Sequence, residues 1–190
     1  QRGRILTGQE STKPGAVPPF TGRWFEEFAA ISDPNRFEAP DVVAVEALKV
    51  AVPTEAAAIL LIVDSERFNS LLRQIPREQN LWEVRRLDVN IGSAAEKLHT
   101  ELRTLPVAEW VVAGKLLAAK RPKLIPIFDN LVNDYLQPPK GLFWVALHDE
   151  LSDPSRRQVI SDVCQAAPSH VSLLRRMDVA LWRAAKRDVR

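Results

Sequence analysis

The chain has 190 residues, 46% of them hydrophobic and 26% charged, and a formal net charge of +2. These values fit one globular domain with its own hydrophobic core. The single cysteine, Cys164, excludes an internal disulfide and a zinc site built from cysteines, and the small net charge argues against a strongly basic protein that coats nucleic acids.

A cytoplasmic location is expected. The longest uninterrupted apolar run, from Ala56 to Val63, is far shorter than the roughly 20 residues that a membrane-spanning helix requires. The N-terminal residues lack the apolar core and small-residue cleavage site of a secretory signal. The histidines show no metal-ligand spacing, so we expect neither a metal nor another cofactor, and no membrane partner.

Residues 1–19 are expected to form a flexible N-terminal arm. Glycine and proline recur in this segment, and its apolar residues follow no period. We therefore expect residues 20–190 to form a single α-helical domain.

Prolines divide the next part of the chain into pieces of helical length. Pro40 precedes a segment in which apolar residues recur at spacings of three and four, and Pro53 opens an alanine-rich segment. A third helix is expected over residues 65–75. Residues 76–91 show no clear period and are expected to be irregular.

A capping box predicts where the following helix begins. Ser93 and Glu96 have the spacing at which the two side chains satisfy each other's backbone N–H groups. We expect this helix to continue to Leu105, because Pro106 interrupts it.

Further helices are expected over residues 109–120, 129–136, 142–151, 154–166 and from about residue 169 onward. Strand signals are absent. The expected fold is all-α, a single compact multi-helix domain of about eight or nine helices. On the last helix, Asp178 falls on the apolar face, and a buried carboxylate there needs a partner such as Arg175 or Arg121.

The central segment LRTLPVAEWVVAGKLLAAKRPKLIPIFDNLVNDYL, residues 102–136, indicates a helix, a tight turn, a helix, a proline-bounded loop and another helix. This order resembles the helix–hairpin–helix segment of the base-excision DNA glycosylases. The resemblance implies a helix–hairpin–helix, DNA-glycosylase-like centre in which backbone N–H groups of the hairpin hold a DNA phosphate.

The match to that family is partial. Leu105 and Pro106 correspond to the entry of the hairpin, and Ala113 to an alanine of the second helix. Val107 and Glu109 stand where the family has glycines, which let the backbone approach a phosphate closely.

The resemblance also implies a catalytic carboxylate at Asp129. Val111 stands where bifunctional members have a lysine, which leaves a monofunctional route that uses water. Such chemistry needs a pocket for a flipped base, and Phe128, Tyr135 and Trp110 are the candidates for its walls. Asp129 has a structural alternative, which is to cap the helix that it begins.

A wider resemblance extends from about Phe20 to Trp182. The strings DVVAVEALKVAVP, GKLLAAKRPKLIPIFD and LLRRMDVALW are similar to an uncharacterised actinobacterial family, a domain of unknown function. This resemblance implies no activity.

The leading functional hypothesis is a nucleic-acid-associated, non-catalytic domain that makes sequence-independent phosphate contacts with DNA. The residues expected at this interface are Trp110, Lys115, Lys120, Arg121 and Lys123.

Two alternatives belong to other classes. Balanced charge and aromatic-rich segments around Trp82 and Trp144 fit a module that binds a protein partner. The third hypothesis is a glycosylase-like enzyme that depends on Asp129.

Overall fold

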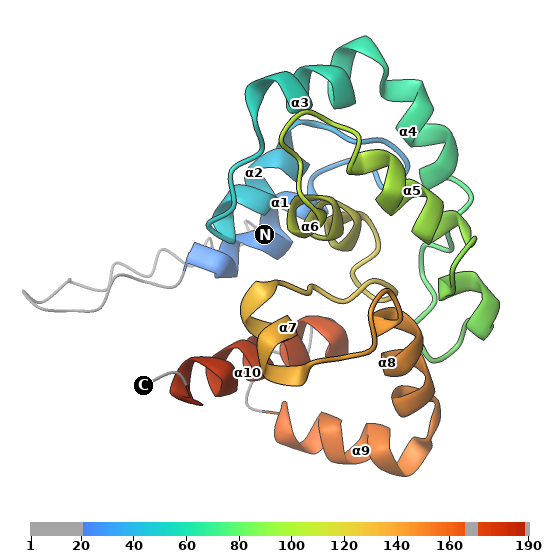
Figure 1. The fold of residues 1–190 in the computed structure, drawn as a ribbon, viewed down its shortest axis with the longest axis vertical. Helices are drawn as coiled ribbons and strands as arrows, with labels where there is room; N and C mark the ends of the chain where they lie inside the picture. Colours follow the sequence, from blue (N-terminus) through green and yellow to red (C-terminus); the bar gives the residue numbers. More distant parts are fainter. Residues whose placement is uncertain (1–20, 166–170, 189–190) are drawn as a thin grey trace, which may run out of the picture.

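The computed structural model describes residues 21–165 and 171–188, and within them the chain forms helices and no strands (Figure 1). The α-helices are α1 (Trp24–Ala30), α2 (Ala39–Ala47), α3 (Thr54–Ala58), α4 (Ser65–Leu72), α5 (Ala94–Leu102), α6 (Trp110–Lys120), α7 (Asn130–Leu136), α8 (Phe143–Ser152), α9 (Pro154–Val163) and α10 (Leu173–Asp188). Shorter elements are η1 (Thr21–Arg23), the π-helical η2 (Ile59–Val63) and η3 (Arg86–Val89). The predicted all-α fold of one compact domain is confirmed.

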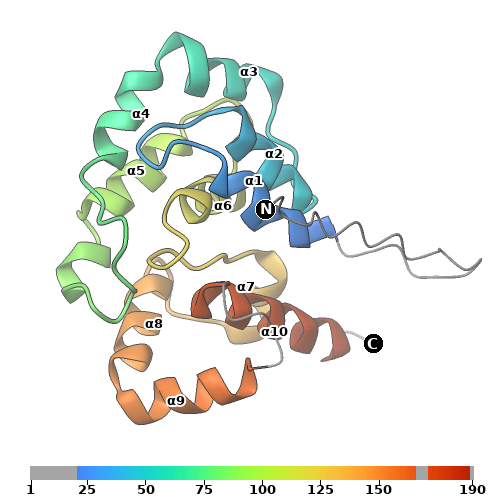
Figure 2. The same ribbon diagram turned by 180° about the vertical axis from the view of Figure 1, so that it is seen from behind.

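The helices form two groups, α1 to α6 in one half of the molecule and α7 to α10 in the other (Figures 1 and 2). In the first half, α6 packs against α1, α2 and α5, and α4 packs against α5. In the second half, α10 packs against α7, and α8 against α9. The short η3 contacts both α5 and α8 and so joins the halves.

Helix α6 lies at the centre of the larger group. Every residue of this helix except Trp110 and Gly114 is buried, and Leu116 and Leu117 are fully buried. A helix that is covered on all sides has an apolar sequence all round instead of one apolar stripe. This position also buries the two lysines of the helix, Lys115 and Lys120.

Local capping explains where several helices begin. The Ser93 hydroxyl accepts a hydrogen bond from the Glu96 backbone N–H at 3.1 Å, as the capping box predicts. The Glu96 carboxylate accepts from the Gly92 backbone N–H instead of that of Ser93, so only half of the predicted box forms. Asp153 caps α9, whose first residue is Pro154.

The structure differs from the sequence prediction in a few places. Ten α-helices are present among the described residues instead of eight or nine, because α1 was not predicted as a separate element. The predicted arm over 1–19, the predicted end of α9 at 166 and the predicted start of α10 near 169 lie outside the described residues.

Helix α10 is the longest helix of the described residues and it is amphipathic. Leu174, Met177 and Ala185 are buried, whereas Arg183 and Lys186 are exposed. In the part of the chain that the structure describes, neither α10 nor any other helix has the length and apolarity to cross a membrane.

Candidate functional site

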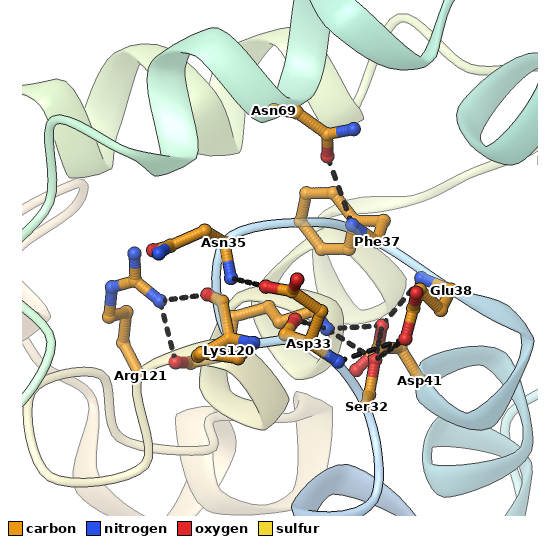
Figure 3. Close-up of polar contacts among 10 residues, drawn as sticks. Ser32, Asp33, Asn35, Phe37, Glu38, Asp41, Asn69, Lys120 and Arg121 are labelled. Atoms are coloured by element: carbon orange, nitrogen blue, oxygen red, sulfur yellow. Dashed lines mark hydrogen bonds and ion pairs between the residues drawn. The ribbon is translucent and has the colours of Figure 1, made fainter.

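Lys120, predicted to contact phosphate, lies inside the protein at the end of α6 (Figure 3). Its Nζ is 2.5 Å from Asp41 Oδ2, and it donates to Ser32 Oγ at 2.6 Å and to the Asp33 carbonyl oxygen at 2.7 Å. Burial lowers the pKa of Lys120 and raises the pKa of Asp41, and the attraction between the two groups opposes both shifts. The ammonium uses its three protons inside the protein and has none left for a phosphate.

Arg121 is also buried, with 0% of its surface exposed. Its guanidinium donates to backbone carbonyl oxygens of Leu72 at 2.6 Å, Pro34 at 2.7 Å and Ile75 at 3.0 Å, and to that of Lys120 at 2.9 Å. Burial lowers its pKa to about 10. The side chain connects the end of α4 and the loop after α1 to the end of α6, which is a structural role.

These two positions correct the sequence prediction. A phosphate backbone must reach the charged groups that bind it, and Lys120 and Arg121 are enclosed and already occupied. Neither side chain is available for the predicted DNA contact in this fold.

Two of the three remaining interface candidates, Trp110 and Lys123, have different surroundings. Trp110 is half-buried, and its ring centroid lies 5.5 Å from that of Phe128, which stacks on Phe143. Lys123 is exposed, and its Nζ lies 3.1 Å from Glu78 Oε2. Lys123 therefore keeps the accessibility that the predicted contact requires, while Trp110 belongs to an aromatic cluster.

The turn between α5 and α6 has a backbone conformation that usually requires glycine. Val107, which is 81% exposed, has φ of 57°, in the left-handed region. A β-branched residue adopts this region only at an energetic cost. The turn thus has one positive φ at a position where the resemblance expects glycine.

Asp129 caps α7. Its Oδ1 accepts a hydrogen bond from the Val132 backbone N–H at 3.0 Å, and its own backbone is extended. The capping alternative is therefore confirmed. Asp129 also lines a cavity.

That cavity, which we call the Lys115 cleft, has a volume of about 360 Å³. It lies between α6, the start of α7, α10 and residues 47–50 after α2. Lys115, Asp129, Arg175 and Asp178 are its charged lining residues with buried or half-buried side chains. Among the described residues, no three His, Cys, Asp or Glu side chains form a metal site here or elsewhere.

Lys115 is 4% exposed, and its Nζ makes one long hydrogen bond, of 3.5 Å, to the Leu48 carbonyl oxygen. Burial lowers the pKa of Lys115, and Asp129 and Asp178 partly offset this effect through space. Lys115 follows Val111 by four residues, so both lie on one face of α6 and both line the cleft. The sequence predicted that Lys115 contacts a phosphate, but in the structure its side chain is buried.

Asp178 pairs with Arg175, as the sequence predicted for one of two arginines. Arg175 also donates from Nε to Glu26 Oε1 at 2.6 Å and from a terminal nitrogen to the Gly22 carbonyl oxygen at 3.2 Å. Burial raises the pKa of Asp178 to about 6, against the attraction of Arg175. Arg175 is a wall of the Lys115 cleft and also of a second, larger cavity.

The second cavity, which we call the basic groove, has a volume of about 760 Å³. It lies between α1, residues 77–82, α9 and the first turns of α10. Its accessible cations are Arg77, Lys123, Arg157 and Arg176. Its two carboxylates are Glu26, which is bound to Arg175, and Glu78, which both Arg77 and Lys123 approach to 3.1 Å.

Of the arginines in the basic groove, Arg157 is held by its neighbours, whereas no residue that the structure describes holds Arg176 in this way. The Arg157 guanidinium lies 5.3 Å from the centroid of the Trp82 ring and donates to the Leu151 carbonyl oxygen at 2.5 Å. The Nε of Arg176 is buried and has no hydrogen-bond partner among the described residues. The groove therefore presents more positive charge than its own carboxylates neutralise.

Sequence reasoning found only Lys123 of these four cations. The other three come from the loop after α4, from α9 and from α10, so they are far apart in the chain. No spacing or motif links such positions, and only the packing of the two halves brings them together.

Comparison with known proteins gives a family but no activity. The profile of a family of unknown function, DUF6308, matches residues 9–185. No curated protein and no solved structure matches the chain. Since the match covers most of its length, the chain belongs to the family DUF6308.

Proposed function

We propose that this protein is a nucleic-acid-associated domain that binds the phosphate backbone of DNA through the basic groove, without reading sequence and without catalysis. The observation that supports this function best is the convergence of four accessible cations on one cavity. Of the carboxylates that the described residues contribute to it, Arg175 binds Glu26 and leaves Glu78. Lys123 was already predicted from the sequence to contact phosphate. Arg77, Arg157 and Arg176 take the place of the buried Lys115, Lys120 and Arg121.

The chemistry of the groove suits phosphate. The guanidinium group presents several donors in one plane, which matches two oxygens of a phosphate. Arg157 is already held over Trp82, so less side-chain freedom is lost on binding. Arg176 is half-buried in the wall of the groove, and its guanidinium adds a further positive charge there.

The net charge of the chain sets the expected affinity for DNA. Because the formal net charge is only +2, long-range attraction to DNA is weak and local contacts dominate. About four phosphate contacts predict a slope of roughly −3 to −4 when the logarithm of the binding constant is plotted against that of the salt concentration.

Fluorescence anisotropy with labelled single-stranded and duplex oligonucleotides tests the proposal. In low salt the wild-type protein should bind at least one of them at micromolar concentration. The double variant Arg77→Glu/Arg157→Glu should lose most of this binding, and its salt slope should be shallower by about two, one for each lost contact. Thermal unfolding of the variant establishes that it is folded.

Arg103→Glu is the matched control. Arg103 is exposed, and it follows α5 at the hairpin turn, where the resemblance places the phosphate contact. The hairpin and the groove lie at opposite ends of α6, which spans about 16 Å. Loss of binding in Arg103→Glu with full binding in the groove variant would move the interface to the hairpin. That result, or no binding by the wild type, overturns the proposal.

The two alternative functions stay predictions. For base release at Asp129, Phe128, Tyr135 and Trp110 are the predicted walls, but none of these rings lines the cleft beside Asp129. The aromatic side chain that the described residues contribute to that cleft is Trp182. For a protein partner, no contact or surface described above favours one kind of partner over another.

A further inference from the structure

Of the two buried lysines in the central helix, Lys115 has the weaker polar contacts. It has one hydrogen bond, of 3.5 Å, whereas Lys120 has a carboxylate, a hydroxyl and a carbonyl within 2.7 Å. A buried ammonium that lacks a counter-charge costs free energy. Lys115 also lines a cavity, so there is room beside it for a group that would supply that charge.

The two carboxylates of the Lys115 cleft do not supply it. Asp178 is paired with Arg175, and Asp129 accepts the capping hydrogen bond of α7. Among the described residues, neither carboxylate forms an ion pair with Lys115. Both act on the lysine through space, and its ammonium keeps donors that no group of residues 21–165 or 171–188 uses.

The remaining lining of the cleft is mostly apolar. Val111, Ile127, Leu131 and Val179 lie around it, and Trp182 adds an aromatic ring. A volume of about 360 Å³ falls at the lower end of the range for small-molecule sites. An occupant that fills this space therefore has a compact apolar body.

We infer that the Lys115 cleft binds a small carboxylate with an apolar body, with the carboxylate paired to the Lys115 ammonium and the body against Val111, Ile127 and Trp182. A monoanion fits better than a phosphate dianion. One ammonium matches one charge, and the nearby Asp129 and Asp178 repel a second negative charge.

The entrance of the cleft favours an anion. Lys49 and Lys186 are exposed lining residues of the cleft, and the Lys186 ammonium lies 4.1 Å from the centroid of the Trp182 ring. Neither forms an ion pair within the ranges that the structure describes, so both add positive potential where a ligand enters. This inference does not depend on DNA binding, because none of the four groove cations lines the cleft.

Isothermal titration calorimetry at neutral pH with 1-naphthylacetate and 1-naphthylacetamide tests the inference. The two probes have nearly the same size, and only the first is charged. Wild-type protein should bind the acetate about tenfold more tightly than the amide, the difference expected when a charged hydrogen bond replaces a neutral one. Inorganic phosphate should not displace the acetate.

Lys115→Met and Lys115→Gln should abolish the preference for the acid. Lys97→Met, at an exposed lysine of α5 outside the cleft, should leave it unchanged. Equal affinity of the two probes, no binding of either at millimolar concentration, displacement by phosphate, or a preference that persists without Lys115 each overturns the inference. The comparison of acid with amide uses wild-type protein, so it is decisive even where a variant does not fold.

Discussion

Lys115 and Lys120 lie on the same helix, α6, and each is 4% exposed, yet within the described part of the chain Lys120 alone of the two has a carboxylate in contact with its ammonium. The two lysines are therefore buried to the same extent but differ in the polar groups that contact their ammonium groups. Asp41, the partner of Lys120, has one oxygen with three polar neighbours and one buried oxygen to which no described residue donates a hydrogen bond.

Replacement of each lysine by methionine should change stability in opposite directions. Lys120→Met leaves Asp41 buried without its partner and should lower the free energy of unfolding by about 3–5 kcal/mol. Lys115→Met removes a buried charge that forms no ion pair with any described residue and should raise the free energy of unfolding by about 1 kcal/mol. Urea unfolding measures both, and equal destabilisation by the two changes contradicts the difference in their surroundings.

Arg121→Lys should be strongly destabilising although it preserves the charge. Four backbone carbonyl oxygens accept from the guanidinium, and the shorter, differently shaped ammonium cannot reach all of them. With buried acceptors left unsatisfied, we expect a loss on the order of 3 kcal/mol in thermal or urea unfolding. Arg36→Lys, at an exposed arginine, is the control and should be close to neutral. An Arg121→Lys variant as stable as this control would show that the carbonyls do not need the guanidinium.

Asp178 should make stability depend on pH in a defined window. Its pKa is raised by burial from 3.8 to about 6, so between these values the folded protein binds a proton that the unfolded chain does not. The contribution of Asp178 to the free energy of unfolding therefore falls as pH rises from about 4 to about 6, by roughly 3 kcal/mol in total. Asp178→Asn should remove this slope from urea titrations across the window. Asp134→Asn, at an exposed acid, should preserve it, and the same slope in both variants would contradict the prediction.

Val107→Gly should stabilise the protein, because glycine adopts the φ of 57° found there without strain. We expect a gain of about 1 kcal/mol. Val159→Gly is the counterpart, since Val159 is also exposed but lies within α9. That change should cost about 1 kcal/mol, because glycine weakens a helix. Destabilisation by both changes would mean that the hairpin turn gains nothing from glycine.

The helices were predictable because their signals are local. Prolines, the Ser93 cap and the apolar spacings act within a few residues, and they gave most of the elements that the structure contains. Helix α1 was not predicted separately, since it has seven residues and no side-chain cap. Its position is fixed by packing against α2 and α6, and no local sequence pattern indicates such packing.

The roles of the cations were not predictable from their neighbours in the sequence. Charged side chains are usually exposed, so a run of lysines and arginines at the end of a helix indicates a surface. Lys120 is buried because Ser32, 88 positions away, and Asp41 meet it in the folded chain. Asp178 was the exception, because its partner Arg175 lies on the same helix, one turn away.

Arg175 gives the two cavities a common wall, and a shared wall is a route for communication. The side chain binds Glu26 on the side of the basic groove and Asp178 on the side of the Lys115 cleft. An occupant that draws the guanidinium toward one cavity withdraws positive charge from the other. The two occupancies would then be thermodynamically linked, and the effect of the first on the second would equal the effect of the second on the first.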